Sequence, residues 1–173
     1  LSAVNKAHGG ERALKGVTSW QMTGTIKRLT DGANGKYSSY ASGGKMYGEA
    51  YDLGGFEVSS GYNGKSGWTR DSKDGLRTIT GKSANDFQAE AQYRNTRWLN
   101  TKAEKTKLAS GGVATLGDKQ YNLVLLTTAK GVRIQLYFDR TTNLLFREVI
   151  ERGIDTKAID YYDYRNVNGM QVP

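Results

Sequence analysis

The fold is decided by residues 20–53, which read WQMTGTIKRLTDGANGKYSSYASGGKMYGEAYDL. At the start of this stretch, Trp20, Met22 and Ile26 alternate with polar residues, which is the pattern of a β-strand buried on one face. The Asp-Gly, Asn-Gly and Gly-Gly pairs that follow are typical of tight hairpin turns. We therefore expect consecutive antiparallel hairpins.

The same pattern of short alternating segments and glycine turns continues through most of the chain. We expect about ten strands in one continuous sheet, which is close to the size at which an open twisted sheet curls. The segments with strand patterns are 19–29, 36–41, 45–53, 56–60, 66–69, 76–80, 113–116, 121–128, 132–138, 144–150 and 158–164. The stretch before Val113, with its lysines and Gly111-Gly112, is expected to be a loop or a poorly ordered edge.

Two helical regions accompany the strands. Residues 1–15 have helical spacing that is interrupted at Gly9-Gly10. Residues 83–100 are predicted to form a helix capped by Ser83, with Phe87, Ala91 and Trp98 on one face. These elements predict a mainly β, α+β fold: a strongly curved antiparallel sheet whose concave side is covered by an N-terminal helix and a central helix.

Composition narrows the class of protein. The 173 residues suit one domain, and 22 glycines against one proline favour a turn-rich β protein. The absence of cysteine excludes disulfides and thiolate catalysis. No stretch of about 18 apolar residues is present to form a membrane-spanning helix. We expect no cofactor.

The formal net charge is +8, but the basic residues are scattered among turns and strands. Only Lys102, Lys105 and Lys107 cluster. This distribution favours an ordinary solvated surface, with weak attraction to anionic membrane surfaces as the alternative, and argues against a specific nucleic-acid site.

Few residues suit catalysis or metal binding. His8 is the only histidine, and no Gly-x-Ser-x-Gly motif accompanies it, so we expect a surface or capping role. Asp71 and Asp74 precede a glycine turn and are expected to bind their own backbone rather than a metal.

Two carboxylate pairs represent the enzymatic alternative. Asp160 and Asp163 face apart by strand parity, as do Glu148 and Glu151. Neither pair converges within its own strand, so we expect a protein that is not an enzyme.

Large apolar residues supply the candidate ligand-binding set, because methionine and aromatic side chains adapt to flexible chains. The same residues suit an ordinary core. The set is Trp20, Met22, Ile26, Phe56, Val58, Trp68, Phe87, Trp98, Ile134 and Leu136.

Five segments carry a resemblance that spans nearly the whole chain. They are AHGGERAL at 7–14, VTS at 17–19, GYNGKSGW at 61–68, LYFD at 136–139 with Leu144-Leu145, and DYRNVNG at 163–169 with Pro173. In this order and spacing they resemble the outer-membrane lipoprotein-sorting protein family. The resemblance implies an unclosed antiparallel β-barrel, with helices on its concave side, in a periplasmic protein that shields lipid or acyl chains. The architecture is also similar to envelope-stress sensors and mycobacterial lipid carriers.

These observations together predict a non-enzymatic cell-envelope domain, located in the periplasm or at the outer membrane, that holds a lipid or lipoprotein acyl chain between sheet and helices. The domain is expected to span 1–173 and to be trimmed at one or both ends. The alternative is a sensor or protein-interaction domain with a filled core and an envelope protein as its partner. A carboxylate-dependent hydrolase is a more remote alternative.

Overall fold

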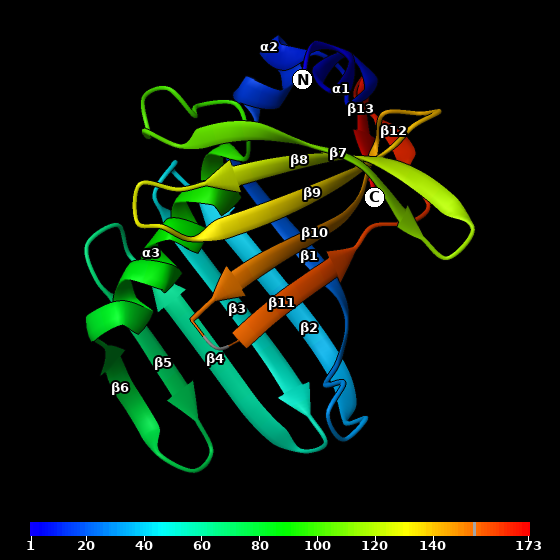
Figure 1. Cartoon of the computed structure of the whole chain (residues 1–173). Coiled ribbons are helices and arrows are strands. Elements are labelled where there is room, and N and C mark those ends of the chain that lie inside the picture. Colours follow the sequence, from blue (N-terminus) through cyan, green and yellow to red (C-terminus); the bar gives the residue numbers. More distant parts are fainter. Residues whose placement is uncertain (154) are drawn as a thin grey trace. The chain divides into compact units, whose positions relative to one another are not determined.

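The computed structural model describes residues 1–153 and 155–173. These residues form two compact units (Figure 1). The middle unit comprises Thr18–Arg97, and the terminal unit combines Leu1–Val17 with Trp98–Pro173. The prediction of a single domain over 1–173 stays a prediction.

The middle unit is a six-stranded antiparallel sheet in the order β1-β2-β3-β4-β5-β6, with one helix, α3, against it. Each strand pairs with its neighbour in sequence because only short turns connect them. Between β3 and β4, Gly54 and Gly55 have φ of 65° and 87°, a conformation that suits glycine in a two-residue hairpin loop. The strands are β1 (Ser19–Lys27), β2 (Asn34–Ser42), β3 (Met46–Leu53), β4 (Phe56–Tyr62), β5 (Gly67–Asp71) and β6 (Gly75–Ile79).

Helix α3 spans Gly81–Thr96, so it begins two residues before the predicted start. The predicted serine cap is wrong: the N-cap residue is Thr80, which makes no side-chain capping bond, and Ser83 lies inside the first turn. The helix ends before Arg97, whose φ of 50° breaks the helical path. Trp98 therefore lies outside the helix, and the predicted shared face with Phe87 and Ala91 is wrong for Trp98.

The terminal unit contains a five-stranded antiparallel sheet, a two-stranded hairpin and two short helices. The sheet order is β11-β10-β9-β8-β7. The helices α1 (Ser2–Ala7) and α2 (Glu11–Gly16) are separated at the predicted glycine pair. The strands are β7 (Lys107–Leu116), β8 (Lys119–Thr127), β9 (Arg133–Asp139), β10 (Leu145–Arg152), β11 (Asp155–Asp160), β12 (Arg165–Val167) and β13 (Met170–Val172).

Strand β7 differs from the sequence prediction: its first half is predicted to be a loop but is part of the strand. The strand pairs with β8 from Lys107 onward, and its register shifts between Ser110 and Gly112. Gly112 has a φ of 74°, so the glycine pair forms a β-bulge within the strand. Glycines therefore do not end the strand at this position.

The core of the terminal unit follows the alternation predicted for β9. Ile134, Leu136 and Phe138 are almost completely buried, and Leu145 and Ile150 of β10 are buried on the same face. His8 is also buried, so a surface position is wrong, but the alternative capping role is confirmed because His8 is the C-cap residue of α1. Its Nδ1–H donates to the Val4 carbonyl at 2.9 Å, and its Nε2 accepts from the Leu145 N–H at 3.3 Å.

The predicted fold class is confirmed: the described residues form a mainly β structure of antiparallel sheets that are not closed into a barrel, with a helix over the six-stranded sheet. The prediction of one continuous sheet is wrong, because the hydrogen-bonded strands form three sheets. Within these residues, no helix has the length and apolar character needed to cross a bilayer.

Candidate ligand-binding face

One face of the six-stranded sheet carries α3, and we call it the helix face. Directly paired residues on antiparallel strands lie on the same face, so the strand registers assign every side chain to one face or the other. The row beneath the helix consists of Trp20, Ala41, Tyr47, Tyr62, Gly67 and Ile79. We call the other side of the sheet the opposite face.

The space between α3 and this row is filled by the side chains of the middle unit. Phe87 and Ala91 of the helix form one buried cluster with Ala41 and Tyr47 of the sheet, and no member is more than 4% exposed. The rings of Tyr47 and Phe87 lie 5.8 Å apart, in tilted contact. Trp20 packs against the cluster and donates its indole N–H to the Arg94 carbonyl at 3.0 Å.

Farther along the same strands, the helix face carries a second group of apolar side chains. They are half-buried, except for Phe56, which is 38% exposed. From Trp20 to Ile26 the apolar row on β1 extends about 20 Å at the usual rise per residue of a strand. The group consists of Met22 and Ile26 on β1, Tyr51 and Leu53 on β3, and Phe56 and Val58 on β4.

Polar groups, which the sequence pattern does not predict, interrupt this apolar face. Glu49 of β3 is 5% exposed and accepts hydrogen bonds from the hydroxyls of Tyr47 at 2.9 Å and Tyr37 at 3.4 Å. On α3, Arg94 forms a buried ion pair with Glu90 at 3.2 Å. Burial, followed by the charges of Glu90 and Glu49, raises the pKa of Tyr47 well above its ordinary value. The helix face is therefore amphipathic.

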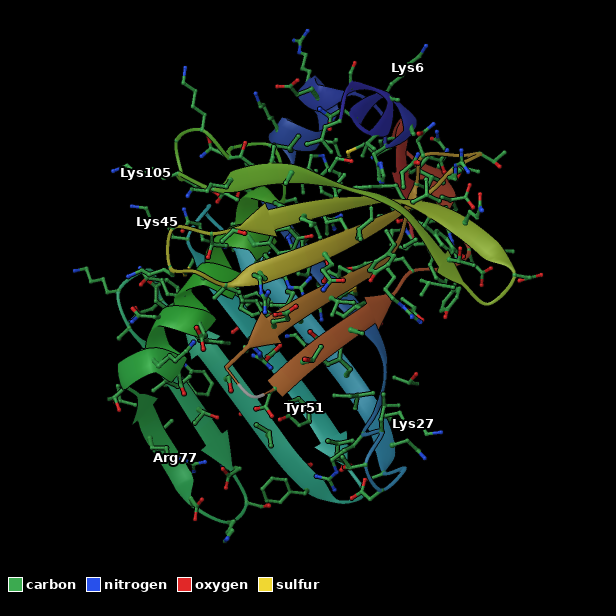
Figure 2. The ribbon with its side chains drawn as sticks, viewed as in Figure 1. Lys6, Lys27, Lys45, Tyr51, Arg77 and Lys105 are labelled. Carbon is green, nitrogen blue, oxygen red and sulfur yellow. The ribbon has the colours of Figure 1, made fainter. Side chains whose placement is uncertain are left out.

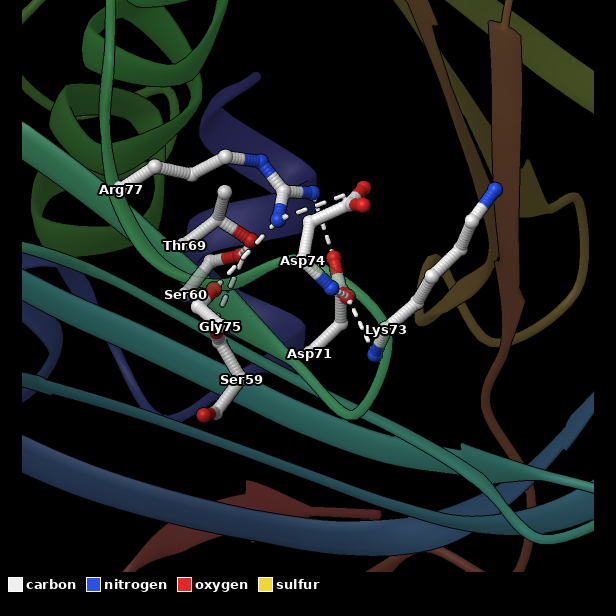
Figure 3. Close-up of polar contacts among 8 residues, drawn as sticks. All are labelled: Ser59, Ser60, Thr69, Asp71, Lys73, Asp74, Gly75 and Arg77. Atoms are coloured by element: carbon white, nitrogen blue, oxygen red, sulfur yellow. Dashed lines mark hydrogen bonds and ion pairs between the residues drawn. The ribbon is translucent and has the colours of Figure 1, made fainter.

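A polar cluster occupies the β5–β6 hairpin (Figure 3). Asp71 accepts the N–H groups of Lys73 at 2.9 Å and Asp74 at 2.7 Å, so the predicted binding of its own backbone is confirmed. Asp71 also pairs with Arg77. The Arg77 hydrogen bond, with those backbone bonds, lowers the pKa of Asp71 to about 2. Over the ranges 1–153 and 155–173, no three His, Cys, Asp or Glu residues are grouped to hold a metal ion.

The structure brings six of the ten candidate residues together in the middle unit. Five belong to the helix face of the sheet, and Phe87 belongs to the helix above it. Trp68 lies on the opposite face, because its partner on β4 is Gly61, which does not belong to the row beneath the helix. Trp98, Ile134 and Leu136 are buried in the terminal unit. A ligand-binding role for the ten residues stays a prediction.

Three carboxylates of the enzymatic alternative lie in strands β10 and β11, whereas Asp163 lies in the connection before β12. The predicted strand 158–164 is wrong beyond Asp160, so strand parity does not relate Asp160 to Asp163. Asp160 pairs with Arg147, which lowers the pKa of Asp160, and it also accepts the Tyr162 hydroxyl at 3.1 Å. Glu151 pairs with Arg133 at 2.7 Å, while Glu148 lies on the other face of β10. The predicted divergence of Glu148 and Glu151 is confirmed.

Basic side chains are spread over both units (Figure 2). In the middle unit, Lys27 ends β1, whereas Lys45 lies in the turn after β2, at the other end of the sheet. In the terminal unit, Lys6 belongs to α1 and Lys105 to the connection before β7. This spread agrees with an ordinary solvated surface, and attraction to anionic membranes stays a prediction.

Comparisons with solved structures identify the fold. A LolA superfamily protein from Nitrosomonas europaea aligns with a TM-score of 0.52 and 13% identity, over 100% of this chain and 83% of that protein. A DUF1329 family protein from Desulfovibrio piger gives 0.50 and 12%, over 98% and 81%. A candidate outer membrane lipoprotein-sorting protein domain from Vibrio parahaemolyticus gives 0.50 and 8%, over 92% and 77%.

The chain therefore has a fold similar to that of LolA-like lipoprotein-sorting proteins, and the predicted resemblance is confirmed at the level of fold. No protein-family model matches the sequence. No curated protein matches it either.

Proposed function

We propose that this chain is a non-enzymatic binding domain of the cell envelope that holds a lipid or acyl-chain ligand against the helix face of its six-stranded sheet. The fold similarity to lipoprotein-sorting proteins supports this class of function. By the same similarity, we propose a periplasmic or outer-membrane-associated location and a lipid or lipoprotein as the partner.

One observation carries the proposal: the group of half-buried apolar side chains that continues along the helix face beyond the cluster beneath α3. Met22, Ile26 and Val58 belong to this group. Methionine and aliphatic side chains suit a flexible acyl chain, because they offer apolar contact without fixing one geometry. An acyl chain lying along β1 would shield these side chains from water.

The energetics of such a site predict that affinity follows chain length. Each methylene that leaves water contributes about 0.8 kcal/mol, which is about fourfold in Kd before ordering costs. Fatty acids of increasing length should therefore bind with steadily rising affinity. An affinity that depends on the headgroup and not on chain length would contradict this site.

A matched pair of variants tests where the ligand lies. Ile26→Glu places a charge on the helix face, whereas Thr25→Glu places the same charge one residue away on the opposite face. We expect Ile26→Glu to abolish the binding of a fluorescent fatty acid and Thr25→Glu to retain it, with both variants folded by circular dichroism. Equal binding by the two variants would refute the proposed site.

A sensor or protein-interaction domain is the second candidate, and the closed cluster beneath α3 favours it. Ala41, Tyr47, Phe87 and Ala91 leave this part of the helix face inaccessible. Fatty-acid titration separates the two candidates. A lipid carrier should change the fluorescence of Trp20, which lies next to the apolar group on β1, whereas a domain with a filled core should give no saturable response.

A further inference from the structure

On the opposite face of the six-stranded sheet, two neighbouring glycines are flanked by one aromatic residue on each side. Tyr40 pairs with Gly48, Gly48 pairs with Gly61, and Gly61 pairs with Trp68. The four residues therefore form one row across β2, β3, β4 and β5, with the glycines at its centre. Neighbouring strands are about 4.8 Å apart, so the two glycines leave a narrow floor without side chains between Tyr40 and Trp68.

The side chains of Tyr40 and Trp68 extend over the two glycines. A Cβ atom added at Gly48 would lie 2.3 Å from Cζ of Tyr40, and one added at Gly61 would lie 2.6 Å from Cε2 of Trp68. The two glycines are buried beneath the rings, whereas Tyr40 stays 50% exposed and Trp68 stays 36% exposed. A larger residue at either glycine position would displace the ring.

The polar atoms of both rings lie over the glycines: a Cβ atom at Gly48 would lie 2.5 Å from the Tyr40 hydroxyl oxygen, and one at Gly61 would lie 2.6 Å from Trp68 Nε1. Across residues 1–153 and 155–173, neither the Tyr40 hydroxyl nor the Trp68 indole N–H has a hydrogen-bond partner in the protein. The next row on this face has small or hydroxyl-bearing residues on β1 to β4, an arginine on β5 and a leucine on β6. It consists of Thr23, Ser38, Ala50, Ser59, Arg70 and Leu76.

We propose that Tyr40 and Trp68 bind a pyranose ring of an oligosaccharide on the opposite face of the sheet. A pyranose has an apolar C–H face, which stacks on aromatic rings, and an edge of hydroxyl groups, which accept from O–H and N–H donors. The paired rings and their free donors offer both kinds of contact. Arg70, two residues from Trp68 on the same face, adds further donors beside the rings.

Other ligand classes fit this surface less well. A stable protein partner would need a far larger interface than the two aromatic rings provide. Residues with hydroxyl groups surround these rings. An acyl chain needs a continuous apolar surface, which the serine and threonine residues of the adjacent row interrupt. Aromatic rings over glycines also stabilise sheets. That structural role accounts for the position of the rings over the glycines, and it leaves the exposed parts of Tyr40 and Trp68 open to a ligand.

Two-dimensional ¹H–¹⁵N NMR of the indole groups tests the proposal. The three tryptophans give three indole N–H signals, and loss of one signal in Trp68→Phe assigns Trp68. Because the contacts are few, we expect a Kd of about 1 mM, so cellotriose, maltotriose and tri-N-acetylchitotriose are each titrated to about 10 mM. The Trp68 signal should shift and saturate with at least one trisaccharide. The signals of Trp20 and Trp98, whose N–H groups bond to Arg94 and Asn5, should stay in place.

Variants separate binding from sheet stability. Tyr40→Phe keeps the ring and removes the hydroxyl, and it should weaken binding severalfold while the denaturation midpoint stays nearly unchanged. Tyr40→Ala should abolish binding, and Leu76→Ala, which removes a 70% exposed side chain from the next row, should leave binding intact. If Tyr40→Ala does not fold, Tyr40→Phe decides alone. The proposal is overturned if no trisaccharide shifts the Trp68 signal, or if Tyr40→Phe and Leu76→Ala bind with equal affinity.

Discussion

Glu90 and Arg94 form an ion pair at 3.2 Å on α3, although their side chains are only 0% and 4% exposed. The two residues are one helical turn apart, which is the spacing at which opposite charges meet on a helix. Burying both charges is costly, and their mutual attraction offsets this cost only while both are present. The pair therefore makes the packing of α3 sensitive to the loss of either charge.

We expect Arg94→Met to destabilise the protein by about 3–5 kcal/mol, because it leaves the buried Glu90 carboxylate without its charged neighbour on the helix. The double variant Glu90→Leu/Arg94→Met should be more stable than Arg94→Met alone, since neither charge then remains. Urea denaturation of the wild type and these variants measures both differences. A double variant less stable than Arg94→Met would show that the pair is not the main interaction of Glu90.

Stability should also fall in acid through Asp71. The folded-state pKa of this carboxyl is about 2, below its ordinary value of 3.8, because Arg77 and two backbone N–H groups bind the charged form. The stabilisation is therefore complete above about pH 5 and is lost progressively as the pH falls through 3.8 toward 2.

Asp71→Asn should lower stability at neutral pH and reduce the loss of stability between pH 5 and pH 2.5, measured as denaturation midpoints. Asp74→Asn is the matched control, because its carboxylate is 56% exposed and lies 3.7 Å from Arg77. Equal pH profiles for Asp71→Asn and the wild type would contradict the assigned role of Asp71.

His8 should stabilise the terminal unit through its hydrogen bonds as well as its ring. His8→Phe keeps an aromatic ring beside Trp98, whose ring centroid is 5.5 Å away, but removes the acceptor for the buried Leu145 N–H. We expect a loss of about 1–3 kcal/mol, the usual cost of a buried unsatisfied polar group. Thermal denaturation measures it, and a His8→Phe variant as stable as the wild type would show that packing alone explains the buried histidine.

The glycine pair between α1 and α2 offers a test of close packing. A Cβ atom at Gly9 would lie 2.6 Å from the Gly169 carbonyl oxygen, whereas one at Gly10 meets nothing within 4 Å. Both glycines have positive φ, so Gly10→Ala isolates the backbone cost, which is about 1–3 kcal/mol. Gly9→Ala should cost clearly more, because the backbone of the β12–β13 turn must also move. Equal denaturation midpoints would contradict this contact.

The sequence predicts the middle sheet well because its signals are local. Hairpin turns and alternation place β1 to β6 within a few residues of their observed bounds, and the alternation on β1 puts Trp20, Met22 and Ile26 on one face. The first half of β7 is not predicted, because Gly111 and Gly112 form a bulge. In the sequence, a glycine pair in a bulge looks the same as a glycine pair in a turn.

The buried charged residues of the helix face cannot be predicted from the sequence for a different reason. Charged residues are mostly found on surfaces, so Glu49, Glu90 and Arg94 give no sequence signal of burial. The four-residue spacing of Glu90 and Arg94 signals a helical ion pair, but it does not show which side of the helix faces the sheet. The opposite-face position of Trp68 follows only from the strand register, which sequence alone does not fix.

Photo-crosslinking locates a bound acyl chain on the protein. A fatty acid carrying a diazirine near its methyl end is bound and irradiated, and the modified residues are mapped by mass spectrometry. We expect adducts on the helix face of the middle unit, at Met22, Ile26 or Val58, and we expect them to disappear when unlabelled fatty acid competes. The absence of competable adducts, or adducts confined to the terminal unit, would contradict the proposed site.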